Sequence, residues 1–170
     1  MVATKKQNNM ILDDYKNFLD KLLHDIEERG VDVSKYDLDH FGYQCSSDED
    51  CDRLKPEFEK YAKLIDEAIV SGRRVGIFKL NISLEYKNWQ IQAVELVAPK
   101  EGQVCPSALE HAEFVIDTDF DTFVKKYPNL TWDMSKVNQP TFPMITLKLS
   151  DNTQVKFHYK PVLEIVKQEK

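Results

Sequence analysis

Apolar residues near the start of the chain recur at steps of three and four, which is the period of an amphipathic helix. Gly30 is suited to end this helix, because glycine readily adopts the left-handed conformation that follows many last helical turns. His24 falls on the polar side, where we expect it to be solvated. Residues 1–30 are therefore expected to form a helix that packs against a single main domain, residues 31–170. Its apolar stripe consists of Ile11, Leu12, Tyr15, Phe18, Leu19, Leu22, Leu23 and Ile26.

The following segments alternate apolar and polar residues, which indicates strands, with one helical interruption. Ser46-Ser47-Asp48 is a capping signal for that helix, and Pro56 is expected to kink or break it. Ser71-Gly72 is typical of a tight hairpin turn. This first module, residues 38–98, is predicted to contain a strand over Asp39–Cys45, a helix to about Tyr61, and strands over Ala62–Val70, Arg73–Leu80 and Trp89–Val97.

The same order of elements recurs after a linker over residues 99–106. The second module, residues 107–160, is predicted to contain a strand over Leu109–Ile116, a helix over Asp119–Tyr127, and strands over Thr131–Val137, Met144–Leu149 and Gln154–Tyr159, followed by a short helix from Pro161. We therefore expect an α+β fold in which two paired β-α-β-β-β modules form one curved mixed sheet, with the helices outside, a cleft inside and the N-terminal helix as an addition. Both modules lie in one chain, so a complete site can form within a monomer.

Composition narrows the classes of partner. The chain has 170 residues and a formal net charge of −6, and its basic residues cluster no further than pairs such as Arg73-Arg74, so nucleic acid is not an expected partner. The N-terminus lacks the apolar stretch of a signal peptide, and no run approaches the roughly 20 apolar residues of a membrane span. A cytoplasmic protein without a membrane partner is predicted. Three cysteines without CxxC spacing make a disulfide framework unexpected.

Side chains alternate across a strand, so parity sorts the histidines and acids by face. In four predicted strands one face is apolar, and the other carries His40, Glu95, His111 and His158. If these faces share the inside of one curved sheet, three imidazoles and a carboxylate converge into a ligand set for a transition metal such as Zn, Ni, Mn or Fe. The alternative is that four half-polar strands turn a wet face to solvent.

Several motifs resemble the YecM-like family within the vicinal oxygen chelate superfamily, which includes glyoxalase I, extradiol dioxygenases and bleomycin-resistance proteins. They are Asp39-His40, Gly72 to Leu80, Trp89-Gln90, Val94-Glu95-Leu96, Glu110-His111-Ala112-Glu113 and Val155-Lys156-Phe157-His158. The resemblance implies a paired-module fold and metal ligands in the order His, Glu, His, Glu. His158 stands where the superfamily usually has the fourth ligand, a glutamate, and Glu164 follows Pro161 in a helix and is a poor substitute.

The resemblance implies a metal that chelates two neighbouring oxygens of a small-molecule substrate. Glu95 is the ligand expected to move and act as a base, and Glu113 is a candidate for a second acid or for orienting a ligand, with an exposed strand glutamate as the alternative. Gln44 and Lys156 are candidates for lining the pocket. A metal-dependent enzyme is one hypothesis, and a small-molecule binding or sequestering protein on the same fold is another. Metal affinity is expected to fall as the pH drops through the ordinary histidine pKa of about 6.5.

Overall fold

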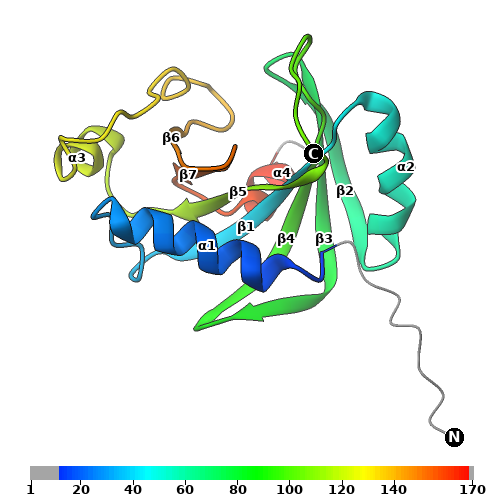
Figure 1. The fold of residues 1–170 in the computed structure, drawn as a ribbon, viewed down its shortest axis with the longest axis horizontal. Helices are drawn as coiled ribbons and strands as arrows, with labels where there is room; N and C mark the ends of the chain where they lie inside the picture. The colour runs from blue at the N-terminus through cyan, green and yellow to red at the C-terminus, as the bar shows by residue number, and fades with distance from the viewer. Residues whose placement is uncertain (1–11, 169–170) are drawn as a thin grey trace, which may run out of the picture.

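The computed structural model describes residues 12–168, where seven strands form one curved mixed sheet in the order β2-β3-β4-β1-β5-β7-β6 (Figure 1). In chain order the elements are α1 (Tyr15–Glu28), β1 (Asp37–Gln44), α2 (Asp48–Glu59), β2 (Ala62–Val70), β3 (Arg73–Tyr86), β4 (Trp89–Val97), β5 (Ala108–Val115), α3 (Phe120–Lys125), β6 (Ile145–Lys148), β7 (Gln154–His158) and α4 (Val162–Gln168).

The two modules meet at the centre of the sheet. In the first module β1 pairs in parallel with β4, in the second β5 pairs in parallel with β7, and the antiparallel β1–β5 pairing joins them. The predicted α+β fold, with a curved mixed sheet and an added N-terminal helix, is confirmed. Strand β3 is longer than predicted, and its far end forms a second hairpin with β4.

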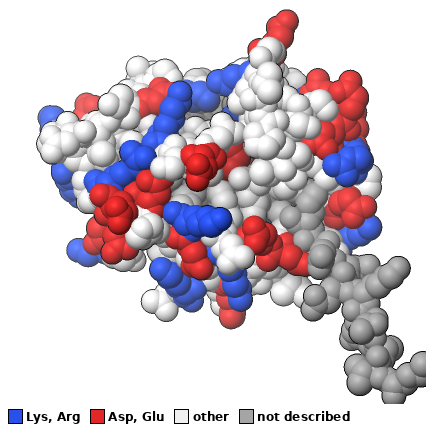
Figure 2. All heavy atoms as spheres, in the orientation of Figure 1, with Lys and Arg blue, Asp and Glu red and all other residues white. Residues whose placement is uncertain are grey.

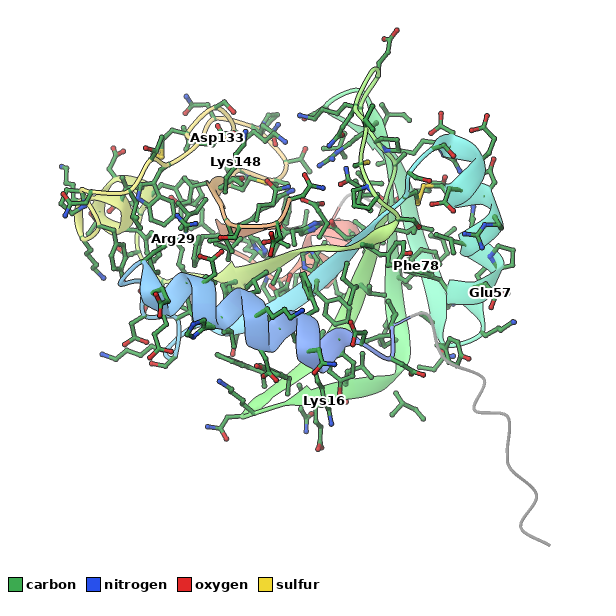
Figure 3. All side chains as sticks on the ribbon, viewed as in Figure 1. Lys16, Arg29, Glu57, Phe78, Asp133 and Lys148 are labelled. Carbon is green, nitrogen blue, oxygen red and sulfur yellow. A yellow bond between two sulfur atoms is a disulfide. The ribbon has the colours of Figure 1, made fainter. Side chains whose placement is uncertain are left out.

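One predicted strand does not form. Residues 131–137 make a single bridge to the sheet, between Asp133 and Thr146. Asp133 instead accepts a hydrogen bond from the Ser135 backbone, and the Val137 amide donates to the Met134 carbonyl. These local hydrogen bonds fold the segment into turns, so its backbone is not available for a ladder. Figure 3 shows Asp133 above Lys148 at the β6 edge of the sheet.

Helix α1 covers the face of the sheet on the viewer's side in Figure 1. Four of its apolar residues are buried: Tyr15, Leu19, Leu22 and Ile26. Tyr15 stacks on Phe41 of β1 with ring centroids 5.9 Å apart. At the other end, Gly30 has φ of 83°, and the amides of Gly30 and Val31 donate to the last turn as in a Schellman motif. The helix packs on the domain as predicted, while Ile11 lies outside the described residues.

Helix α2 covers the same face over the outer strands. Ser47 caps it by accepting from the Asp50 amide, and the helix runs through Pro56 as one element, so the predicted break is absent. Cys51 in its first turn forms a disulfide with Cys45, whose Cα lies 5.4 Å away; the bond is visible in Figure 3. The expectation of no disulfide was wrong, because the turn between β1 and α2 brings two cysteines of unremarkable spacing together.

Helix α4 lies on the opposite face of the sheet, where the fold was expected to leave only a cleft. Val162 and Val166 bury their side chains with Ala93 of β4. Ala93 is the register partner of His40 on β1, so this helix covers the face that carries the histidines. We call this surface, which bears His40, Glu95 and His111, the site face.

Among the described residues, no helix is long and apolar enough to cross a membrane. Acidic and basic side chains are interspersed over the surface seen in Figure 2, without a continuous basic area in that view.

Leu19→Ala should lower the free energy of unfolding by about 2–5 kcal/mol, because Leu19 is fully buried between α1 and the sheet and its loss leaves a cavity. Lys21→Ala, an exposed change on the same helix, should alter it by less than about 0.5 kcal/mol. Urea unfolding followed by circular dichroism measures both. Equal, small effects would show that α1 does not contribute to the core.

Candidate metal centre

The central strand β1 aligns the polar side chains of its neighbours. In the β1–β5 register His40 lies opposite Glu113, and Gly42 lies opposite His111. On the other side of β1, Gly42 is the register partner of Glu95. Side chains at paired positions lie about 5 Å apart on one face, so two histidines and two glutamates meet over β1.

These four side chains form one buried group. His40 Nε2 lies 2.7 Å from Glu113 Oε2 and 3.0 Å from Glu95 Oε1. His111 Nε2 lies 3.1 Å from Glu95 Oε2 and 3.0 Å from Glu113 Oε2. One donor atom from each residue can be chosen so that all four lie within 4.8 Å of one another. Glu113 is 1% exposed, which excludes the alternative of a solvated strand glutamate.

Two further acids enter the site face through bulges. Asp39 is an extra residue in β1 and Glu110 an extra residue in β5, where the β1–β5 register shifts. Each bulge turns its carboxylate toward the next residue: Asp39 Oδ2 lies 2.6 Å from His40 Nδ1, and Glu110 Oε2 lies 3.1 Å from His111 Nδ1. Both histidines are thus held through Nδ1, leaving Nε2 directed at the shared glutamates. Asp39 Oδ2 also accepts from the Val162 amide at the start of α4.

Gly42 provides the space for the His111 ring. A Cβ at this position would lie 2.1 Å from His111 Cε1 and 2.6 Å from Nε2. Any larger residue at position 42 must therefore push the ring away from the two glutamates.

His158 lies beside this group and not within it. Its Nε2 is 3.6 Å from both Glu113 Oε1 and Asp39 Oδ2. The strand registers explain its place. In the first module Gly42, two residues after His40, pairs with Glu95 on β4. In the second module Glu113, two residues after His111, pairs with Lys156 on β7. Lys156 is therefore the second module's counterpart of Glu95, and His158 sits one pleat further along β7.

Without a metal, the buried acids and histidines strongly shift one another's pKa values. Burial lowers the pKa of His40, but the Glu113, Glu95 and Asp39 carboxylates outweigh it and raise this pKa well above its ordinary value. Burial and the Lys156 cation lower the pKa of His111, yet Glu110 and Glu113 outweigh them and raise it to about 10. Two imidazolium rings therefore accompany the carboxylates at neutral pH.

The glutamates respond in the opposite sense. Burial and the nearby Glu113 raise the pKa of Glu95, but His40 and His111 outweigh them and lower it to about 2. Burial likewise opposes ionisation of Glu113, whose pKa His40 and His111 hold well below its ordinary value. Burial lowers the pKa of His158, which keeps that ring neutral.

Four buried side-chain atoms in the described part of the chain have no hydrogen-bond partner: Arg73 Nε, Glu113 Oε1 and both ring nitrogens of His158. Buried polar atoms are nearly always paired, so such a cluster indicates a missing ion, water or ligand. The nitrogen and oxygen atoms of His40, Glu95, His111 and Glu113, at separations of 2.7–3.1 Å, fit the donor set of a divalent transition metal.

A cavity of about 390 Å³ opens beside the group. Glu95 and Glu113 reach it from the sheet, and Val162 and Val166 of α4 form part of its wall. Lys156 also lines it, as predicted, whereas Gln44 is buried outside this cavity and Glu164 lines a different depression. A small molecule in this cavity would contact the two glutamates directly.

The structure thus brings together His40, Glu95, His111 and Glu113, places His158 at their edge, and leaves His24 on the solvent side of α1 with a 73% exposed side chain. Strict alternation assigns Asp39 and Glu110 to the opposite face and so misses their contacts with the histidines. The signal that points to them is the acid–histidine pair repeated at the start of both modules.

Comparison with known proteins agrees with this architecture. Protein YecM of Escherichia coli (strain K12) is 27% identical over 176 residues, covering 93% of this chain and 94% of that protein. A solved structure named Protein EC4020 is similar with a TM-score of 0.72 at 27% identity, covering 94% of this chain and 91% of that one.

A more distant solved structure has a similar fold. Methylmalonyl-CoA epimerase, solved in complex with methylmalonyl-CoA and NH4+, is similar with a TM-score of 0.51 at 12% identity, covering 75% of this chain and 96% of that one. At this identity the likeness shows the fold alone. The sequence matches the family described as YecM protein over residues 7–156, which is most of the chain, and the chain therefore belongs to the YecM family.

Proposed function

We propose that His40, Glu95, His111 and Glu113 bind one divalent transition metal (Zn, Ni, Mn or Fe) and that the protein is a metal-dependent enzyme acting on a small oxygenated molecule. The observation that carries this proposal is the convergence of two imidazole nitrogens and two carboxylates, all buried, beside a cavity. The histidine at position 158, the fourth ligand expected from parity, is replaced in this proposal by Glu113.

The geometry supports the proposal. Ligand atoms around a tetrahedral metal with bonds of about 2.0 Å lie about 3.3 Å apart. The four nearest nitrogen–oxygen separations are 2.7–3.1 Å, so a small outward movement makes room for the ion. Asp39 and Glu110 already hold Nδ1 of the two histidines, which is the usual outer support of a metal-binding imidazole.

Besides holding the metal, the two glutamates are candidates for proton transfer. A bound metal would act as a Lewis acid and as a template for neighbouring substrate oxygens. Both oxygens of Glu95 contact histidines, whereas Glu113 is held through Oε2 and its Oε1 has no hydrogen-bond partner among the described residues. Glu113 is ionised at neutral pH and lines the cavity, so it is a candidate for accepting a proton from a ligand. Glu95 stays the second candidate base.

The fold is compatible with a small-molecule ligand, since the similar epimerase binds methylmalonyl-CoA. Helix α4 and residues 139–142 line the cavity, and Glu95 and Glu113 are only 6% and 1% exposed.

After removal of bound ions with a chelator, the protein should take up about one metal per chain when reconstituted with Zn, Ni, Mn or Fe(II), as measured by elemental analysis. His40→Ala and His111→Ala should each weaken binding by about 100-fold or more, since even the loss of an outer support costs 10–100-fold.

His24→Ala, an exposed change, should leave the affinity unchanged and serves as the control. His158→Ala should have a smaller effect than His40→Ala, because His158 lies outside the group. Stoichiometry near zero with all four metals would defeat the proposal, and metal binding without any turnover would favour the sequestering alternative.

Metal affinity should continue to rise above pH 7, because the ligating imidazoles are neutral and the metal must displace protons held by raised pKa values. The raised histidine pKa values move the pH at which metal affinity falls to above about 6.5, the value expected for an unperturbed histidine. In the metal-free protein, the protonated rings of His40 and His111 stabilise the folded state. This stabilisation is complete below about pH 6.5 and is lost as the pH rises through the raised pKa values of the folded state, about 10 for His111.

Calorimetric titration with Zn at pH 7 in buffers of different ionisation enthalpy should detect release of about two protons per metal. Binding that releases no protons would show that the two histidines are not the ligands.

Gly42→Ala should weaken metal binding although residue 42 has no donor atom, because the new Cβ displaces the His111 ring. Gly76→Ala is the matched control: it is also a strand glycine, but its Cβ would lie 3.2 Å from Phe78, 3.6 Å from Leu64 and 3.7 Å from the Leu96 carbonyl, and near no residue of the centre. Both variants are compared by elemental analysis after equilibration with limiting Zn. Equal retention of metal would show that His111 is not held in place by the space at position 42.

A further inference from the structure

Three basic side chains line the same cavity as Glu95 and Glu113. Arg73 comes from the start of β3, Lys136 from the loop that replaces the missing strand, and Lys156 from β7. Lys156 lies opposite Glu113 in the β5–β7 register, so the basic side chains begin directly beside the proposed metal ligands.

These cations make no direct ion pair with the described part of the protein. Among the described residues, no carboxylate oxygen lies within 4.0 Å of the charged nitrogens of Arg73, Lys136 or Lys156, and Arg73 Nε has no hydrogen bond at all. Arg73 is 8% exposed and Lys156 is 6% exposed. Burying a charge is unfavourable unless it is paired, and Glu110 and Glu113 act on these cations only from beyond ion-pair distance, so a bound anion would stabilise them.

Arg74, the residue next to Arg73, is paired with carboxylates. Arg74 points to the opposite side of β3, where it pairs with Asp52 at 2.8 Å and with Glu67 at 3.2 Å. Burial and the neighbouring Lys156 and Arg73 cations lower the pKa of Lys136, which agrees with positive charges crowded around one space.

The charged side chains that line the cavity indicate which ligands it would bind. They are three acids and three bases: Asp66, Glu95, Glu113, Arg73, Lys136 and Lys156. With a divalent metal on the two glutamates, the lining carries a net charge of +2. Much of the remaining wall is apolar, from residues such as Val75, Ile77, Phe142 and Met144. An occupant therefore needs negative charge at one end and a compact apolar part.

We propose that Arg73, Lys136 and Lys156 form an anion subsite that selects ligands carrying a carboxylate or phosphate group a short distance from the oxygens that reach the metal. The metal half of this inference rests on the proposed function, while the subsite itself rests on the unpaired cations. It narrows the substrate class from small oxygenated molecules to small anions with one or two acid groups.

The test uses the full chain in its metal-free and Zn-loaded forms, titrated at constant ionic strength with inorganic phosphate and with malonate. Arg73→Gln and Lys136→Gln should each weaken binding of both probes by about tenfold or more, because each removes a charge-assisted contact. Both variants should retain the metal content of the wild type by elemental analysis. Arg74→Gln is the matched control and should stay within about twofold of the wild type.

Circular dichroism verifies that each variant is folded, and Lys136→Gln, in a loop, provides the second arm if Arg73→Gln unfolds. Equal affinities in wild type and variants, with binding only to the Zn form, would mean that the metal alone holds the anion; this overturns the subsite and leaves the metal centre standing. Arg73-dependent binding to a chain that takes up no metal would support the subsite and defeat the proposed function. Absence of anion binding in both forms would overturn the subsite.

Discussion

The antiparallel pairing of β1 with β5 is the constraint on which the rest of the site depends. It joins the two modules, and its register sets His40 against Glu113 and His111 against Gly42. The two bulges in the same pairing place Asp39 and Glu110 beside the histidines they hold. A shift of this register by one residue would send the side chains of the shifted strand to the other face and separate the histidines from their partners. The apolar face under α1 and α2 fixes the register, because Phe41 and Tyr43 must stay buried beneath the helices.

The chemistry of the centre follows from keeping opposite charges together out of water. His40 and His111 are protonated in the metal-free chain because four carboxylates surround them, and the carboxylates stay ionised because the imidazolium rings are near. Replacing two protons by one divalent cation leaves the total charge of the group unchanged. The same arrangement of side chains is therefore tolerated with and without a metal, which explains how so polar a group can exist inside a sheet-based core.

Much of the fold could be predicted from the sequence because periodicity and turn chemistry act locally. The hairpin at Ser71-Gly72 and strand β4 lie where the pattern put them. Thr131 to Val137 was predicted as a strand from alternation, but Asp133 and Ser135 form a local turn that alternation does not report. The Cys45–Cys51 bond depends on a chain reversal between β1 and α2, which residue spacing alone does not show.

The site could be predicted only as far as side chains alternate regularly. Parity placed His40, Glu95 and His111 on one face, and the structure brings them together there. Asp39 and Glu110 break parity because they occupy bulges, and a bulge arises from how two distant strands pair. The need for glycine at position 42 depends on a ring 69 residues away in the sequence. Arg73 and Lys136 approach the cavity from separate modules, so no local pattern connects them.

The position of Asp39 gives the C-terminal helix a role beyond covering the cavity. A single carboxylate oxygen accepts from the Val162 amide, where α4 begins, and from Nδ1 of His40. The docking of α4 and the orientation of the His40 ring are consequently coupled in free energy, and such coupling acts equally in both directions. Whatever occupies Nε2 of His40 changes the charge on the ring and hence the strength of its bond to Asp39. A change in the occupancy of the centre is therefore expected to alter how firmly the start of α4 is held.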